Sequence, residues 1–193
     1  SMQHAFPNAT FPIGAVHEFL SQGNEAGAAT LGFVSALVST LMERSGVALW
    51  ISTSRKVFPP ALRTFGIEPD KVIFLDLKKE REVIWAMEEG LKCAAVTAVV
   101  GEVSEIDFTA SRRFQLAVEE SHVTGFVHRP NVKKITTNAF VSRWRIEPLK
   151  SHVVHDLPGI GFPKWKVELL KIRNGRPGQW NVIWEHGSFN CSR

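Results

Sequence analysis

Residues 15–30 read AVHEFLSQGNEAGAAT, and the order of residue types in this stretch decides the fold. Its first six residues are mostly apolar and predict a β-strand over 15–20. The next eight are small or polar and predict a loop over 21–28. Apolar residues then recur at helical spacing, which predicts a helix over 29–44 that is buried on more than one face. A strand, a small-residue loop and a helix in this order form the setting of a phosphate-binding loop.

The loop departs from a working phosphate-binding loop at the positions that matter for catalysis. Such a loop reads G-x-x-x-x-G-K-[ST], with backbone N–H groups around the phosphates and a lysine on the terminal ones. Ala28 and Ala29 stand in place of the second glycine and the lysine. Charge on a terminal phosphate would not be neutralised, so we expect no ATP hydrolysis by this chain alone and no cofactor. The alternative is a plain strand–helix turn that never held a nucleotide. The residues of this degenerate nucleotide loop are Gly23, Glu25, Gly27 and Thr30.

Strand-length apolar runs continue to alternate with helical patterns up to residue 127. The alternation predicts a parallel sheet wrapped by helices, because continuous apolar strands are typical of sheets covered on both faces. Asp107 is a plausible N-cap for one of these helices. The predicted strands are 47–52, 72–75, 97–103 and 124–127, and the predicted helices are 59–66, 80–93 and 107–121.

The C-terminal third has a different pattern and predicts an antiparallel extension of the sheet. Residues 139–149 alternate in polarity, and the sequence Asn174-Gly175 is a hairpin signal between two further strands. The predicted elements here are strands over 139–149, 164–173 and 179–186, with a polar loop over 129–138 and another loop over 151–163. The fold class is therefore α/β, with a mostly parallel central sheet flanked by helices and extended by antiparallel C-terminal strands.

Length and composition fit one globular domain. The chain has 193 residues, of which 44% are hydrophobic and 22% charged, and it has neither a membrane-length apolar run nor a signal-peptide pattern. We expect a single domain over 11–186, an N-terminal segment over 1–10 whose first two residues resemble a tag scar, and a tail over 187–193. The two cysteines stand alone, so no metal or redox motif is predicted, and a reducing cytoplasm is the expected location.

The net charge of +4 hides an asymmetry between the two parts of the chain. Residues 1–122 contain 11 Lys and Arg against 15 Asp and Glu, whereas residues 123–193 contain 12 against 4. Such a division predicts a basic surface for nucleic acid or an acidic protein. The alternative is a solvated face that is rich in Lys and Arg.

A set of short motifs follows in order along the chain: FPIGAVHE (11–18), LWI (49–51), PALRTFGIEP (60–69), WAMEEGLK (85–92), AVVGE (98–102), TASRRFQLA (109–117) and RWRI (143–146). This ordered set resembles the ImuA family, the RecA-like accessory proteins of bacterial error-prone repair. The resemblance implies a RecA-like core over 11–186. It also implies three partners: ImuB, which is a Y-family polymerase homologue, an error-prone replicative-type DNA polymerase, and RecA. The implied role is in SOS-induced translesion mutagenesis.

When the chain is compared with a RecA-type ATPase, its other catalytic positions also lack the required acidic residues. Residues 52–55 contain no carboxylate to activate water, and Gly101 stands where an acidic residue would support magnesium. Glu102 comes one residue late, and a shift of one residue turns a strand side chain to the opposite face. We therefore expect a protein that is not an enzyme and that acts through contacts with other proteins.

Two basic clusters are candidates for binding. Arg129, Lys133 and Lys134 lie where the RecA fold carries a DNA-binding loop, so they could contact the phosphates of single-stranded DNA. Lys171 and Arg173 resemble the Lys-x-Arg-Asn-Gly hairpin of hexameric helicases, which implies that they face a partner such as the ATP site of RecA. In both clusters the alternative is ordinary exposed charge.

Two other functions remain open from the sequence. One is a SulA-type inhibitor of cell division that binds FtsZ, and the other is an active DNA-dependent ATPase of the recombinase type. The basic clusters favour a role linked to RecA or nucleic acid over the first. The missing lysine argues against the second.

Overall fold

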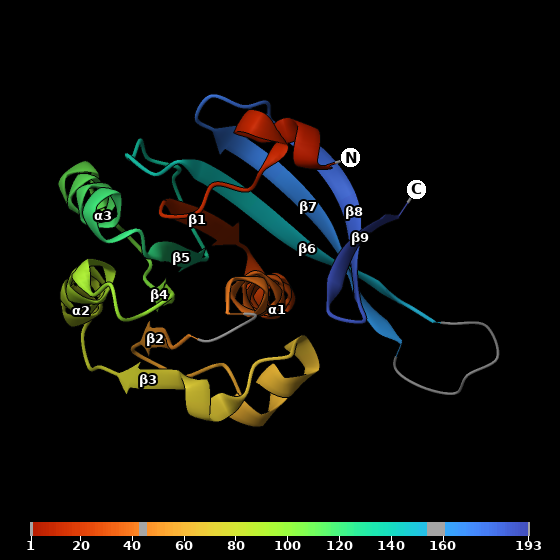
Figure 1. The fold of residues 1–193 in the computed structure, drawn as a ribbon, viewed down its shortest axis with the longest axis horizontal. Coiled ribbons are helices and arrows are strands. Elements are labelled where there is room, and N and C mark those ends of the chain that lie inside the picture. Colours follow the sequence, from red (N-terminus) through yellow and green to blue (C-terminus); the bar gives the residue numbers. More distant parts are fainter. Residues whose placement is uncertain (1, 43–45, 154–160, 193) are drawn as a thin grey trace.

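The described residues form one nine-stranded sheet with helices on both faces (Figure 1). The computed structural model describes residues 2–42, 46–153 and 161–192. The strand order is β3-β2-β4-β5-β1-β6-β7-β8-β9. The strands are β1 (Val16–Ser21), β2 (Ala48–Ser52), β3 (Val72–Asp76), β4 (Ala98–Glu102), β5 (Thr124–Pro130), β6 (Ser142–His152), β7 (Phe162–Ile172), β8 (Gly178–Glu185) and β9 (Ser188–Ser192).

The sheet is parallel from β3 to β6 and antiparallel from β6 to β9. This confirms the α/β class and the antiparallel C-terminal extension. The predicted hairpin turn is present between β7 and β8, but its positive φ, 57°, falls on Asn174 rather than on the glycine that was expected to adopt it. A turn residue with positive φ matches the twist of the two strands it joins.

Three helices cover the sheet, and each buries an apolar stripe. They are α1 (Gly23–Leu41), α2 (Glu80–Lys92) and α3 (Phe108–Ser121). The helix α1 contributes Phe33 to one core, which also contains Phe19 and Trp144 from the sheet. On the opposite face, α2 and α3 contribute Met87 and Phe114 to a second core. Short 3₁₀ helices complete the connections: η1 (Met2–Ala5), η2 (Pro7–Ala9), η3 (Pro59–Phe65) and η4 (Pro69–Lys71).

Several boundaries differ from the sequence-based expectations. The helix α1 begins at Gly23 rather than at residue 29. Residues 23–28 include two glycines and an asparagine, which are poor helix formers, so tertiary contacts such as that of Gly23 with Asn131 favour the helix there. The strand β5 continues to Pro130, so Arg129 belongs to a strand and not to a loop. The expected end of the first helix at residue 44 and most of the expected loop over 151–163 lie outside the described residues.

Both chain ends pack onto the domain. Ala5 and Phe6 of the N-terminal segment are buried in the α1-side core. The residues expected to form a tail contain β9, which pairs antiparallel with β8. Phe189 of β9 lies 5.2 Å from Phe33 and 4.8 Å from Trp184 between ring centroids, so this aromatic contact holds the last strand in place.

Candidate functional site at the carboxyl end of the sheet

The carboxyl ends of β4, β5 and β1 meet the first turn of α1 at one edge of the sheet. Ligands of open parallel sheets bind at this edge, so we describe the site from here. The residues expected to form the nucleotide loop lie here in the first turns of α1.

The first turns of α1 are closed by contacts within the chain. The N–H of Gly23 donates to Oδ1 of Asn131 at 2.9 Å, and Nε2 of Gln22 donates to the carbonyl of Val132 at 2.6 Å. Thr30 is completely buried, and its hydroxyl donates to the carbonyl of Ala26 at 2.7 Å. The helix thus replaces the open loop that would surround a phosphate.

Glu25 places a negative charge in the first turn of α1. A carboxylate is stabilised there by the positive end of the helix dipole. The same carboxylate would repel a phosphate that approached the helix. Gly27 lies in the second turn, where its Cα faces Ser21.

A buried row of polar side chains crosses the strand ends on the α1 side of the sheet. Ser21 Oγ lies 2.8 Å from Nε2 of His128, whose Nδ1 lies 3.3 Å from Oε2 of Glu102. The row has the residue types of a Ser-His-acid triad. Ser21 is only 3% exposed, however, which leaves little of its side chain accessible to a substrate. We interpret the row as structural.

A buried charge cluster occupies the opposite face of β1. Glu18 is completely buried and forms ion pairs with Arg129 and Arg143, with Nη1 of Arg129 at 2.7 Å from Oε1. Arg129 also donates from Nε to the carbonyl of Ser104 at 3.2 Å and is 2% exposed. The prediction that Arg129 lies in a loop is therefore wrong. Its contact with DNA stays a prediction, and the pairing with Glu18 argues against it.

The segment between β5 and β6, residues 131–141, lies over this cluster, and we call it the strap. Three cationic side chains donate hydrogen bonds to backbone carbonyl oxygens of the strap. Arg143 donates to the carbonyl of Thr136 at 2.6 Å, and Arg173 donates to that of Ala139 at 3.0 Å. Lys171 donates to the carbonyls of Asn138 at 3.1 Å and Phe140 at 3.2 Å. Burial, followed by the nearby Arg143, lowers the pKa of Lys171. Lys171 and Arg173, predicted to face a partner, thus both contact their own chain, although Arg173 remains exposed.

Two of the predicted DNA-binding cations remain on the surface. Lys133 and Lys134 are exposed on the strap. The structure thus separates the predicted basic cluster into one buried residue and two exposed ones.

The sequence patterns missed Glu18, His128 and Arg143, which organise this edge. The available signal was a charged or polar residue within an apolar strand, since such residues are seldom buried without partners.

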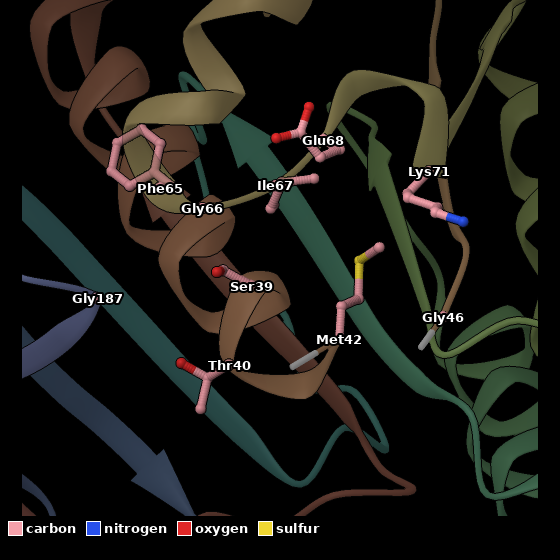
Figure 2. A pocket seen from close by; sticks show the side chains of 10 residues that line it. All are labelled: Ser39, Thr40, Met42, Gly46, Phe65, Gly66, Ile67, Glu68, Lys71 and Gly187. Carbon is pink, nitrogen blue, oxygen red and sulfur yellow. The ribbon is translucent and has the colours of Figure 1, made fainter. Parts of the chain in front are cut away.

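A separate hollow of about 420 Å³ lies at the last turns of α1 (Figure 2). Ser39 and Thr40 line it from the helix, and Glu68 and Lys71 line it from the segment between η3 and β3. Because α1 begins at the carboxyl end of the sheet, this hollow lies at the opposite end of the helix. It is not part of the site described above.

Comparison with known proteins identifies the family. An alignment of 192 residues shows 35% identity to Protein ImuA of Caulobacter vibrioides strain NA1000, covering 93% of this chain and 79% of that protein. The chain belongs to the ImuA family. Protein ImuA of strain CB 15 matches with the same identity and coverage. No protein-family model matches the chain.

The ImuA family relationship extends more weakly to SulA. The cell division inhibitor SulA of Photorhabdus laumondii is 28% identical over 127 residues, which cover 63% of this chain and 70% of SulA. The chain is thus more similar to ImuA than to SulA, in agreement with the resemblance that the sequence motifs show. No helix among the described residues is long and apolar enough to cross a membrane.

Proposed function

We propose that this ImuA-family protein is a non-catalytic, RecA-like accessory factor of DNA-damage-induced mutagenesis that acts through protein contacts. The observation that supports the proposal is the closed start of α1. Asn131 holds the N–H of Gly23, Glu25 adds a negative charge, and Ala29 stands where a lysine would bind phosphate.

The chemistry of phosphoryl transfer supports the non-catalytic part of the proposal. That reaction depends on cations and backbone N–H groups placed around a developing negative charge. At this edge the cations Arg129, which is buried, and Arg143, which is partly buried, are paired with Glu18 on the other face of the sheet. We therefore expect neither nucleotide hydrolysis nor a nucleotide cofactor.

The proposed partners follow from family membership. They are an ImuB-like Y-family polymerase homologue, an error-prone replicative-type DNA polymerase and RecA, in the cytoplasm of cells responding to DNA damage. Single-stranded DNA is a further candidate, through Lys133 and Lys134 rather than Arg129.

A genetic experiment tests the role. Cells that lack the gene should show a lower frequency of damage-induced mutation, and the wild-type gene should restore it. Affinity capture from damaged cells should enrich the polymerase subunits. Enrichment of FtsZ together with filamentous growth on overexpression would instead favour the SulA-type function.

A biochemical experiment tests the absence of catalysis. The purified protein should hydrolyse no ATP above background, with or without single-stranded DNA. Hydrolysis stimulated by DNA would support the recombinase-type ATPase. Arg173→Ala should also be compared with wild type for its effect on the ATPase of RecA, since equal effects would remove this residue from the partner surface.

A further inference from the structure

A groove of about 790 Å³ lies between α2, the start of α3 and the strap. Arg81 and Ile84 line it from α2, Phe108 from α3, and Lys134 from the strap. Phe108, the first residue of α3, is 51% exposed. Exposed aromatic surface beside free cations indicates an interaction site.

The floor of the groove is rigid because its residues are buried. Ile106, Ala110 and Arg129 line it and are at most 5% exposed. Arg129 is the one cation among these three residues, and its ion pair with Glu18 holds its side chain in place.

The walls of the groove are tied to one another. Glu80 of α2 accepts hydrogen bonds from Ser104, at 2.9 Å from its N–H and 2.7 Å from its hydroxyl. The N–H of Ala139 on the strap donates to Ser111 of α3 at 3.0 Å, and Asp107 caps the same helix. A groove whose walls are already fixed loses little conformational entropy when it is occupied.

The charges that line the groove nearly balance, and its unpaired cations lie on α2 and the strap. Arg81 and Lys134 make no ion pair or hydrogen bond within the described part of the chain, whereas Arg113 is paired with Glu88. Glu105 also lines the groove and is likewise unpaired among these residues. With the helix-capping carboxylate of Asp107, which also lines the groove, two unpaired cations face two carboxylates, so the lining is close to neutral and its positive charge is confined to Arg81 and Lys134.

We propose that this groove binds a short segment of a protein partner that carries an apolar anchor side chain next to one or two carboxylates. The anchor would pack between Ile84 and Phe108, and the carboxylates would pair with Arg81 and Lys134. Exposed aromatics and arginines are the residue types that contribute most to protein interfaces. The proposal rests on the accessory role above, for which it names the docking surface.

The charge pattern favours an acidic peptide over single-stranded DNA. A DNA strand brings a phosphate with every nucleotide and binds best in a continuous positive groove with several stacking aromatics. Here Glu105 and Asp107 lie on the wall, and Phe108 is the one aromatic side chain among the lining residues.

Selection from a random peptide library displayed on phage tests the proposal directly. With the whole protein immobilised, enriched peptides should combine an aromatic or branched apolar residue with neighbouring Asp or Glu. A synthetic peptide of the enriched sequence should then lose about tenfold or more in affinity for Phe108→Ala and for the double variant Arg81→Glu, Lys134→Glu. Exchanging its acidic residues for Lys should restore binding to the double variant.

Two matched variants serve as controls, and each leaves the groove intact. Phe58→Ala removes another exposed aromatic, and Lys150→Glu reverses an exposed charge on the antiparallel ladder. Neither should change the affinity. The proposal is overturned if no acidic–apolar motif is enriched or if the groove variants bind as wild type does. It is also overturned if a 20-nucleotide oligo-dT binds more tightly than the peptide through the same residues. Because the selection needs no mutagenesis assay, its failure is distinguishable from failure of the proposed function.

Discussion

Nη1 of Arg129 lies 2.7 Å from Oε1 of Glu18, and both side chains are buried. With Arg143 on the second carboxylate oxygen, one carboxylate neutralises part of the charge of two guanidinium groups. Carbonyl oxygens of Ser104 and Thr136 accept further hydrogen bonds from the same arginines. The cluster links β1, β5 and β6 with the strap, so it determines the shape of the candidate interaction edge.

Removing the central carboxylate should destabilise the protein strongly. Glu18→Gln keeps the size of the side chain but leaves the buried Arg129 and the partly buried Arg143 without a counter-charge. We expect a loss of about 3–5 kcal/mol in the free energy of unfolding, which is typical of breaking a buried pair. Chemical denaturation followed by tryptophan fluorescence measures it.

Asp76→Asn is the matched control for this change. Asp76 pairs with Arg55, but both side chains are substantially exposed. The expected cost is at most about 1 kcal/mol, as for other surface ion pairs. Equal costs for the two variants would contradict the buried role of Glu18.

Arg129 and the strap lysines should differ in what they affect. Arg129→Ala should lower the free energy of unfolding by about 3–5 kcal/mol, because it leaves the buried Glu18 with only one of its two arginine partners. Lys133→Ala and Lys134→Ala should stay within about 0.5 kcal/mol of wild type, since both side chains are exposed.

The affinity for single-stranded DNA, measured at several salt concentrations, should distinguish the role of Arg129 from that of Lys133 and Lys134. For each phosphate contact that a lysine variant removes, the slope of log affinity against log salt should flatten by about 0.7. A conservative Arg129→Lys variant that folds should leave this slope unchanged. A flattened slope in that variant would return Arg129 to the DNA-binding surface.

His17 should make the protein less stable in mild acid. Burial lowers the pKa of His17 from 6.5 to about 4, and the backbone carbonyl of Pro12 opposes this only in part. Nε2 lies 2.8 Å from that carbonyl and must donate, so Nδ1 accepts from Ser142 at 2.6 Å. The unfolded chain takes up the proton at higher pH than the folded protein does. Stability is therefore unaffected above pH 6.5 and falls as the pH decreases from 6.5 to about 4.

The size of this effect follows from the two pKa values. A difference of about 2.5 pKa units corresponds to about 3 kcal/mol at the acid end of the range. Denaturation at a series of pH values should show the loss in wild type. The difference between wild type and His17→Gln isolates it from the titration of carboxylates, and parallel curves would show that His17 does not titrate in this way.

Local patterns were sufficient to predict most elements of this fold. The N-cap at Asp107 is confirmed by the 2.6 Å hydrogen bond from the N–H of Ala110, and the turn at Asn174 by its positive φ. Both features depend on residues within a few positions of each other. Such features depend on the hydrophobic periodicity and on the turn-forming residues of a short stretch, so they can be predicted from a single sequence.

The fate of Arg129 could not be predicted in this way. Its partner, Glu18, is 111 residues away, and the two meet only because the sheet places β1 beside β5. The start of α1 was wrong for a related reason. Residues 23–28 include two glycines and an asparagine, which are poor helix formers, and the contact that closes the start of the helix comes from Asn131, 108 residues away from Gly23.

Restoring the missing lysine should not restore nucleotide binding. Ala29 is only 8% exposed in the core beneath α1, so Ala29→Lys should destabilise the protein by about 1–3 kcal/mol through overpacking. Ala28→Lys adds the same charge one residue earlier at an exposed position and should cost little. Millimolar Mg-ATP should leave the melting temperature of wild type and both variants unchanged. A ligand at 100 times its Kd stabilises by about 2.7 kcal/mol, which would raise the melting temperature of a chain of this size by about 5–10 °C. A rise of that size in Ala29→Lys alone would show that the first turns of α1 can still open around a phosphate.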